Sequence, residues 1–542
     1  MVHVPIEQIA KYGINTELPA HQLPLGAWSN GRNVRFRKNR AERVNGWANV
    51  MDPPEVAPAF IMNVDNNGDS FWLYASAIGA GSKVYAFNSG SHADISNSGD
   101  YNVPQAYNWN GGTFQGIPFL NHGQGVPQYW PDFNLTTDLD DLSDWPANTT
   151  AKILRVFDVF MVALDITDSN GAHIHRVLWS DGAAPGTLPS SWDVDDPAVE
   201  ANHRDLSDTD SGAIQDGMQL RDMFVIYKQQ STWNMRYIGG QSIMDTKQTL
   251  QKSGLLCPRA VTPLTLPQSG TQVHFLHNGI DIGVYDGQTF TSVVDRKLRR
   301  TLNNMLDPIH YRNAYMVDNF VDDEVVFAFP SNGNSKPDVA LVWNYREGQP
   351  YIRDFVGTFA AVGLVESASV DTWATVSGTW ASQGPAKWQE GTLRQTVIAD
   401  QMATKLQQLG GAADNDGVGF EARIIRRGLA VAGVDEENNP IVDMNSRKLV
   451  TRVWPRITNG PIMIRIGGED YIESGLDIDE NAEDNITWLD WQVFDPVTTG
   501  IPYADFVINT RFVAIEIKTT AEMENSWRLS GYAIDLEIVS EL

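Results

Sequence analysis

The residue types that carry enzymatic or metal chemistry occur in this sequence without the spacing that such chemistry needs. There is no G-x-x-x-x-G-K-[ST] phosphate loop, no H-E-x-x-H zinc motif and no G-x-S-x-G nucleophile motif. The single cysteine, Cys257, follows two leucines and precedes a proline, which is typical of a small buried side chain. We therefore predict no catalytic residues, no cofactor and no enzymatic activity.

Two kinds of residue cluster come closest to a metal site. His173 and His175 would share one face of a strand, but no carboxylate at tight spacing completes a ligand set. The segments 65–69 and 414–417 look like the start of calcium loops, yet neither combines glycine at position six with glutamate at position twelve. We expect ordinary histidines and Asx-rich turns without metal, with irregular calcium binding in a β-loop left open.

Short strands are the elements that would position any site. Segments 158–164 and 222–227 are apolar runs bounded by Asp and Gly, and segments 448–457 and 511–518 alternate between apolar and polar residues. Turn signals such as Asp181-Gly182 and Asn332-Gly333 separate these runs. Only the segment 396–409 has helical spacing, and it also reads as two arms of a hairpin. The pattern predicts an all-β chain with few helices.

A weak internal repeat bears on the architecture. Segments 109–114 and 285–290 share the form aromatic–[Asn/Asp]–Gly–x–Thr–Phe, which we interpret as a tight hairpin. A second similarity is that Trp179 and Trp343 each stand at the end of an apolar run. Repeated hairpins with aromatic anchors are typical of divergent β-propeller blades, and unrelated hairpins in a β-sandwich are the alternative.

The charge is acidic overall and uneven along the chain. The 542 residues carry a formal net charge of −27, which argues against a protein that grips nucleic acid by neutralising phosphates. One basic cluster near the N-terminus contains Arg32, Arg35, Arg37, Lys38, Arg40 and Arg43. No Lys or Arg lies between Arg465 and Arg511, whereas this stretch holds eleven acids, and another acidic tract runs from Asp193 to Asp222. Such runs are usually solvated faces, but the basic cluster is also a candidate partner-binding patch.

No membrane span or secretory leader is expected from the sequence. The longest uncharged apolar stretch runs from Phe355 to Val365, which is well short of the roughly 20 residues that a transmembrane helix needs. The N-terminal residues lack a basic region followed by an apolar core.

Several motifs together resemble one protein family. The segment from Leu23 to Arg37, with Arg40 to Arg43 and Gly46-Trp47 behind it, resembles the opening of the tail nozzle proteins of short-tailed bacteriophages, also called tail tubular or tail accessory proteins. Later parts of the chain are similar to the same family in the same order, at segments 238–240, 281–287, 342–345, 352–354, 426–429, 453–457 and 526–532. One departure is the turn Lys38-Asn39-Arg40, where an Asp-Gly type of turn is expected.

The resemblance implies a fold, an assembly and a location. The fold is a β-propeller-based subunit with additional hairpin or sandwich-like elements, and the segment 396–409 becomes a blade hairpin. We expect an N-terminal arm with a basic hairpin (1–50), propeller blades (51–410) and a C-terminal β-rich region that packs on or closes the propeller (411–542). The assembly is a homo-hexameric ring in the virion tail, put together in the bacterial cytoplasm beneath an adaptor ring.

In this reading the ring lengthens the channel through which DNA leaves the capsid, without binding DNA specifically, and it carries fibres, spikes or a needle. The basic cluster would face an acidic adaptor or neighbouring subunit. Glu480, Glu483 and Asp484 are candidate channel-lining acids, because an acidic wall avoids phosphate contacts. The alternatives are a glycan-binding or glycan-cleaving propeller, of which the cleaving form would need paired carboxylates, and a propeller scaffold unrelated to virions.

Overall fold

The computed structural model describes residues 1–51, 54–66, 69–76, 79–97, 101–103, 109–206, 212–365, 393–400, 403–437, 439–471, 486–520 and 526–540. Within these ranges the fold is all-β, and the only α-helices are α1 (Arg299–Met305) and α2 (Pro496–Thr499). Short 3-10 turns occur at η1 (Ala20–Gln22), η3 (Gly240–Ser242) and η4 (Tyr311–Asn313). None of these described helices has the length and apolar character that a membrane span requires.

Seven four-stranded antiparallel sheets follow one another along the chain, and all but the last are built from consecutive strands with at most a short excursion between them. The first three contain β6 (Pro58–Asn66), β7 (Asp69–Ser76), β9 (Val84–Asn88) and β10 (Ser91–Asp94); β12 (Asn110–Phe114), β13 (Ile117–Asn121), β14 (Gln128–Tyr129) and β15 (Asp140–Asp141); and β16 (Thr150–Phe157), β17 (Phe160–Asp168), β18 (Gly171–Trp179) and β19 (Asn202–Asp205). A two-stranded excursion pairs β8 (Gly79–Ser82) with β11 (Tyr101–Val103).

The remaining four sheets follow the same plan. They contain β20 (Ile214–Leu220), β21 (Met223–Lys228), β22 (Ser231–Gly239) and β23 (Ile243–Gln251); β24 (Val261–Leu266), β25 (Thr271–His277), β26 (Ile282–Tyr285) and β27 (Phe290–Ser292); β28 (Tyr315–Asn319), β29 (Glu324–Phe329), β30 (Val339–Asn344) and β31 (Pro350–Asp354); and β32 (Phe359–Val365), β33 (Leu393–Asp400), β34 (Lys405–Leu409) and β5 (Trp47–Asn49).

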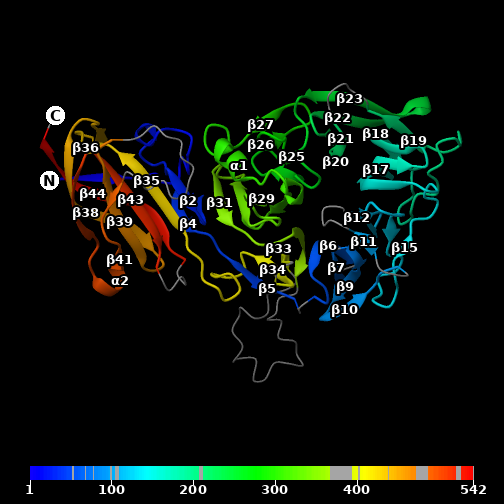
Figure 1. Cartoon of the computed structure of the whole chain (residues 1–542), viewed down its shortest axis with the longest axis horizontal. Coiled ribbons are helices and arrows are strands. Elements are labelled where there is room, and N and C mark those ends of the chain that lie inside the picture. The colour runs from blue at the N-terminus through cyan, green and yellow to red at the C-terminus, as the bar shows by residue number, and fades with distance from the viewer. Residues whose placement is uncertain are drawn as a thin grey trace, which may run out of the picture.

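The seven sheets are the blades of a β-propeller. The first strands of neighbouring sheets contact one another at β6–β12, β12–β16, β16–β20, β24–β28 and β28–β32. Between the fourth and fifth sheets the contact is made by β20 and β25. The first strand of the seventh sheet, β32, contacts β6 of the first sheet, which completes the ring. The ring of blades is visible on the right of Figure 1. Apolar side chains fill the spaces between blades, because each twisted sheet must cover the apolar face of the next.

The ring is closed by a strand from the N-terminal part of the chain. β5 pairs antiparallel with β34, with Trp47 opposite Leu409 and Asn49 opposite Gln407. The blade that contains β5 therefore combines residues from the two ends of the propeller sequence, so the first and last blades are held by backbone hydrogen bonds instead of side-chain packing alone.

The axis of the propeller is filled with side chains. Arg259 lies just before β24 of the fifth sheet, and five of the other sheets contribute the residues around it, namely Phe60, Arg155, Asp216, Tyr315 and Phe359. The Arg259 guanidinium lies 5.0 Å from the centre of the Phe359 ring, and the two carboxylate oxygens of Asp216 accept hydrogen bonds of 2.9 Å from Arg155. Burial lowers the pKa of Arg259 to about 10, which leaves the guanidinium charged at neutral pH.

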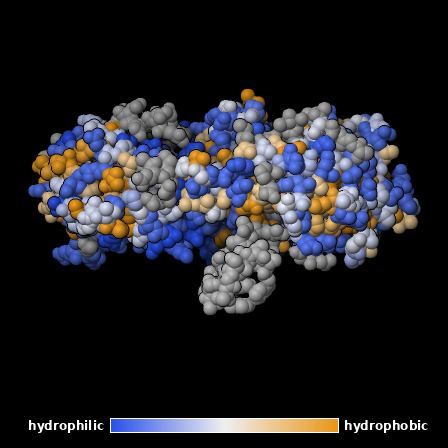
Figure 2. Space-filling view, turned by 90° about the horizontal axis from the view of Figure 1, so that it is seen from below, coloured by the Kyte–Doolittle hydropathy of each residue, from blue (hydrophilic) through white to orange (hydrophobic). Residues whose placement is uncertain are grey.

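The second unit is a β-sandwich on the left of Figure 1, and it keeps this place in the space-filling view from below in Figure 2. One sheet has the order β3 (Val34–Arg37), β4 (Arg40–Arg43), β44 (Arg528–Ser540), β38 (Arg447–Thr458) and β42 (Ala504–Thr510), with β1 (Val2–Ile6) also paired to β44. The other has the order β2 (Asn30–Arg32), β35 (Arg423–Leu429), β43 (Phe512–Thr519), β39 (Ile462–Glu469) and β40 (Thr487–Trp488), with β41 (Gln492–Phe494) also paired to β39. A small hairpin consists of β36 (Val431–Val434) and β37 (Pro440–Val442).

The inner faces of the two sheets form one core that continues into the propeller. Ile462, Ile464 and Ile466 alternate with more exposed residues on β39, as expected for a strand with one buried face. The cluster they belong to also contains Ile534 of the facing sheet and Val326 of the sixth blade. The sandwich and the propeller are therefore joined by apolar packing as well as by chain connections.

Most of the predicted strands are confirmed. The apolar runs become β17 and β21, the alternating segments become β38 and β43, and the segment 396–409 lies in the β33–β34 hairpin instead of a helix. Trp179 and Trp343 lie in the third strands of the third and sixth blades, as expected for a repeat. The predicted segment 1–50 is shared between the two units, since β1 to β4 belong to the sandwich and β5 to the propeller.

The interpretation of segment 109–114 as a hairpin is wrong. Residues 110–114 form the straight strand β12, and the turn follows at Gln115 and Gly116, which have φ of 50° and 89°. Gly111 serves close packing, because a Cβ there would lie 2.6 Å from the carbonyl oxygen of Phe119 on the paired strand. Only the related segment 285–290 contains the expected turn, at Gly287 with φ of 102°.

Gly46 is the residue at which the chain crosses from sandwich to propeller, and we expect it to tolerate no side chain. A Cβ there would collide with the carbonyl of Asp414, so Gly46→Ala should lower the free energy of unfolding by about 2 kcal/mol, measured by urea denaturation. Gly433→Ala is the matched control, because a Cβ at Gly433 meets nothing within 4 Å. Equal losses in the two variants would contradict this role for Gly46.

Candidate partner-binding site

Five of the six residues of the predicted basic cluster lie on the β3–β4 hairpin, and the sixth, Arg32, ends β2. Arg37 pairs with Arg40 at its end, and the two connecting residues, Lys38 and Asn39, have φ of 49° and 57°. Positive φ at both central residues is the geometry of a two-residue hairpin turn, and asparagine adopts it more readily than most residues. The Lys-Asn turn therefore gives the tight hairpin that an Asp-Gly turn was expected to give.

Two arginines of the hairpin point at the propeller. The Arg35 guanidinium donates to Glu42 Oε1 at 2.8 Å and lies 3.2 Å from Asp322 Oδ1, while Arg37 Nη1 donates to the same Asp322 oxygen at 2.6 Å. Asp322 lies in the turn before β29 of the sixth blade, so these contacts join the two units of the fold. Arg35 is nearly buried, and an arginine in such a place needs a charged partner.

Arg32 and Arg43 are also engaged within the chain. Arg32 Nε lies 2.5 Å from Asp354 Oδ1 at the end of the sixth blade, and Asn33 Nδ2 donates to the other oxygen of Asp354. Arg43 Nη1 donates to the carbonyl of Ala413 at 2.7 Å, its guanidinium lies 4.1 Å from the centre of the Phe420 ring, and burial lowers its pKa.

The structure therefore divides the predicted patch in two. Four of its six cations, Arg32, Arg35, Arg37 and Arg43, have acidic, carbonyl or aromatic partners inside the subunit. Lys38 and Arg40 are exposed at the tip of the hairpin. A contact between this hairpin and another protein stays a prediction, and it would use the tip.

The acidic residues that pair with Arg35 and Arg37 were not predicted from the sequence. Asp322 and Glu324 belong to the run Val321 to Glu324 between two strands, and only that local concentration of acids could have signalled a cationic partner. Burial opposes ionisation of Asp322, but Arg35 and Arg37 outweigh it and hold its pKa below the ordinary value. We name the group Arg35, Arg37, Glu42, Asp322 and Glu324 the interdomain joint.

Glu324 is the most deeply buried acid of the interdomain joint. Its Oε2 accepts a hydrogen bond of 3.0 Å from the Tyr351 hydroxyl. Burial raises its pKa to about 7, although the nearby Arg35 acts in the opposite direction. Glu324 is therefore a group that changes its charge near neutral pH inside a contact between two units.

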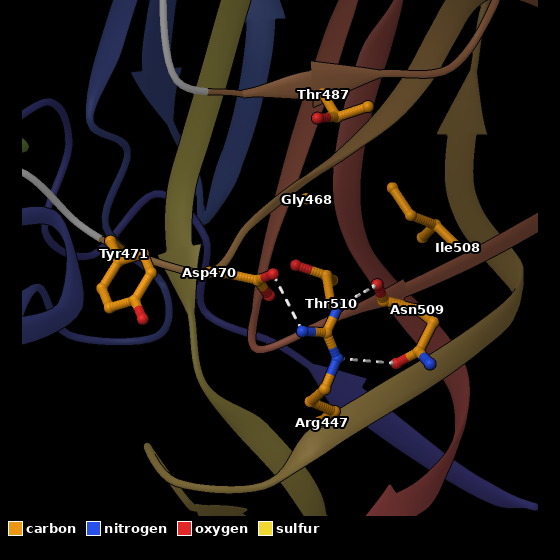
Figure 3. A pocket seen from close by; sticks show the side chains of 8 residues that line it. All are labelled: Arg447, Gly468, Asp470, Tyr471, Thr487, Ile508, Asn509 and Thr510. Carbon is orange, nitrogen blue, oxygen red and sulfur yellow. Dashed lines mark hydrogen bonds and ion pairs between the residues drawn. The ribbon is translucent and has the colours of Figure 1, made fainter.

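A pocket of about 440 Å³ lies at the edge of the sandwich, next to the acidic tract. Figure 3 shows Arg447 at its centre, where Nη1 donates to Asp470 at 2.8 Å and Nη2 donates to the carbonyl of Asn509 at 3.1 Å. The carboxylate among the lining residues, Asp470, is already paired with Arg447, and Thr510 Oγ1 donates to the carbonyls of Glu469 and Phe512, so neither group is free to act as a general base or a nucleophile. The predicted channel acids Glu480, Glu483 and Asp484 lie outside the described residues.

The other residues considered for chemistry have structural surroundings. Cys257 is buried, as predicted, and burial raises its pKa to about 12, so it is no nucleophile. His173 Nε2 lies 3.1 Å from Asp168 Oδ1, and Asp168 also faces Arg176. In the described ranges no three His, Cys, Asp or Glu side chains are grouped so that they could hold a metal ion.

Comparison with known proteins gives no family for this chain. No family model matches the sequence, and no curated protein is similar to it. Among solved structures, the AfRom2 CNH domain is 6% identical with a TM-score of 0.32, covering 66% of this chain and 97% of that one. A variant of exo-β-1,3-galactanase from Phanerochaete chrysosporium, bound to β-1,3-galactotriose, is 7% identical with a TM-score of 0.24, covering 91% and 100%. At these scores neither likeness carries an argument about fold or function.

We expect Asp322→Ala to weaken the interdomain joint strongly. The substitution leaves Arg35 and Arg37 without their shared carboxylate, which should lower the free energy of unfolding by about 2–3 kcal/mol in chemical denaturation. Asp505→Ala is the matched control, because its side chain is 69% exposed, its partner Arg452 is 41% exposed, and exposed pairs contribute little. A loss no larger than that of the control would show that the joint is not held by these charges.

We also expect Glu324 to make stability depend on pH. Its folded pKa of about 7 lies above its ordinary value, so the folded state holds an extra proton between the two, and the free energy of unfolding falls by up to about 1.4 kcal/mol per pH unit as pH rises through this window. Glu324→Gln should flatten the profile between pH 5 and 8, measured by denaturation at each pH. An unchanged slope in this variant would assign the dependence to other groups.

Proposed function

We propose that this chain is a structural subunit of a tail nozzle in a short-tailed bacteriophage. It forms a homo-hexameric ring in the virion tail, beneath the adaptor ring, and extends the channel for genome retention and ejection. The ring is also the platform for fibres, spikes or a needle, and the subunit is not an enzyme. The observation that carries the proposal is the series of family-like motifs that keep their order from Leu23 to Tyr532.

The positions of these motifs support a shared role in assembly. The N-terminal motif enters β2 and β3, the motif at 426–429 ends β35, and the motifs at 453–457 and 526–532 contribute to the paired strands β38 and β44. Arg426 binds the N-terminal motif directly, since its Nη2 donates to the carbonyl of Leu23 at 3.1 Å. Motifs that are far apart in the sequence thus maintain the same sandwich and its attachment to the propeller.

The filled propeller axis supports a channel between subunits. Tyr315, Arg259 and Phe359 meet there, and they leave no passage at that level for a DNA duplex. A nozzle built from this subunit therefore conducts DNA through the centre of the ring, and each propeller is part of the wall.

The distribution of charge supports transit without binding. The chain carries −27 overall, and four of the six cations of the basic hairpin are engaged inside the subunit, so they are withdrawn from contacts with phosphate. Every cation on a channel wall would add a salt-dependent contact with DNA and slow its passage. An acidic surface with internally paired arginines avoids such contacts.

The test is particle imaging of the purified chain with its candidate adaptor ring. We expect a sixfold ring that binds the adaptor, and tail particles lacking this chain should lose their DNA and their fibres. Monomers that ignore the adaptor would contradict the proposal. Incubation with host polysaccharide is the control for the alternative, because release of reducing ends would identify a glycan-cleaving protein instead.

A further inference from the structure

One surface of the propeller is basic although the chain as a whole is acidic. Four of the five residues from Arg296 to Arg300 are cationic; Arg299 and Arg300 begin α1, and Arg296 lies in the turn before it. The Arg296 side chain is 91% exposed and that of Arg299 is 42% exposed. Three acids offset part of this charge, because Asp295 and Asp281 lie 3.0 Å and 3.5 Å from Arg299 and Glu17 Oε1 accepts a hydrogen bond of 2.9 Å from Arg300 N, so the four cations keep an excess of one.

Exposed apolar side chains flank these arginines. Ile280 is 65% exposed and lies beside α1, since Asn303 Nδ2 donates to its carbonyl at 2.9 Å. Ile309 follows the helix and is 76% exposed. Apolar residues within a charged surround are typical of protein–protein interfaces. We name Ile280, Arg296, Arg299, Arg300 and Ile309 the α1 surface.

A second surface has the opposite charge and a similar apolar content. The connection between β18 and β19 carries Asp193, Asp195 and Asp196 on its exposed side, and no cation lies between Asp193 and His203. Backbone N–H groups donate to Asp193 Oδ1 at 3.0 Å and to Asp196 Oδ1 at 2.8 Å, which defines the shape of the loop.

Two exposed apolar residues lie next to this loop. The Tyr237 hydroxyl at the tip of the β22–β23 hairpin donates to Glu200 Oε1 at 2.6 Å, and its neighbour Ile238 is 58% exposed. We name Asp193, Asp195, Asp196, Tyr237 and Ile238 the acidic loop surface. It therefore complements the α1 surface in charge and matches it in apolar character.

The two surfaces lie on different sides of the propeller. Figure 1 shows α1 on the side that faces the sandwich, and β18 and β19 on the far side. A contact between them cannot be made within one subunit, and between copies it is head-to-tail, which is the type of contact that closes a ring. Because like charges oppose one another, each surface also disfavours contact with its own copy.

We propose that the α1 surface of one subunit binds the acidic loop surface of the next copy of this chain. This inference rests on the proposed ring and adds which faces form its interface. The contact between arginines and aspartates sets the orientation of the neighbours, and the apolar residues supply buried area. Assembly is accordingly weakened by salt, since the Debye length falls as ionic strength rises.

A charge-swap experiment tests the interface. The acidic variant carries Arg296→Glu, Arg299→Glu and Arg300→Glu, and the basic variant carries Asp193→Lys, Asp195→Lys and Asp196→Lys. Each alone should need at least about tenfold more protein for half-assembly than the wild type, by mass photometry or sedimentation. A mixture of the two should restore rings, because every neighbour pair then has opposite charges, and a chain with all six substitutions should assemble with itself.

The controls separate this inference from the proposed function. Lys247→Glu with Lys252→Glu changes two exposed cations elsewhere on the propeller and should leave assembly unchanged. If the wild type and the acidic variant form rings equally well, the interface is wrong while the nozzle stands. If the wild type forms no ring even with the adaptor, the proposed function fails. Should the basic variant not fold, as judged by circular dichroism, the acidic variant alone decides the interface.

Discussion

The backbone pairing of β5 with β34 is the interaction on which the rest of the structure depends. It closes the seventh blade with residues that precede the first blade by 9 to 11 positions, and so it joins the two ends of the propeller sequence. Because Trp47 begins β5 directly after the sandwich hairpin, closing the ring also brings the hairpin against the sixth blade. The N-terminal part of the chain thus supplies strands to both units, β1 to β4 to the sandwich and β5 to the propeller, so each unit depends on it.

The interdomain joint shows how an acidic protein uses its arginines. Asp322 receives two of them and Glu42 accepts from Arg35, so the positive charge of the hairpin is balanced inside the fold. Ion pairs that lie partly out of water are more directional than apolar contacts, because both the distance and the orientation of the donors matter. The continuous core provides the bulk of the attachment, and the joint sets the register of the hairpin on the blade.

Local patterns in the sequence predicted much of this fold, and long-range pairings account for what they missed. Alternation identified β38 and β43, and apolar runs bounded by Asp and Gly identified β17 and β21, because those signals arise from neighbouring residues. The three-residue strand β5 has too few residues to show a period, and its partner lies some 360 positions away. For the same reason the sequence suggested that the arginines of the basic cluster form a surface patch, because their partners Asp322 and Asp354 are distant in the sequence and approach them only in the folded chain.

The two chain segments that cross between the units have a mechanical consequence. They run side by side, because Gly46 N donates to the carbonyl of Ala412 at 2.9 Å and Gly410 N donates to the carbonyl of Gly46 at 2.8 Å. A single tether would allow the sandwich to swivel about its axis, whereas two tethers bonded to each other resist torsion. The two units should therefore move as one rigid body, so that a force applied to the sandwich also displaces the propeller.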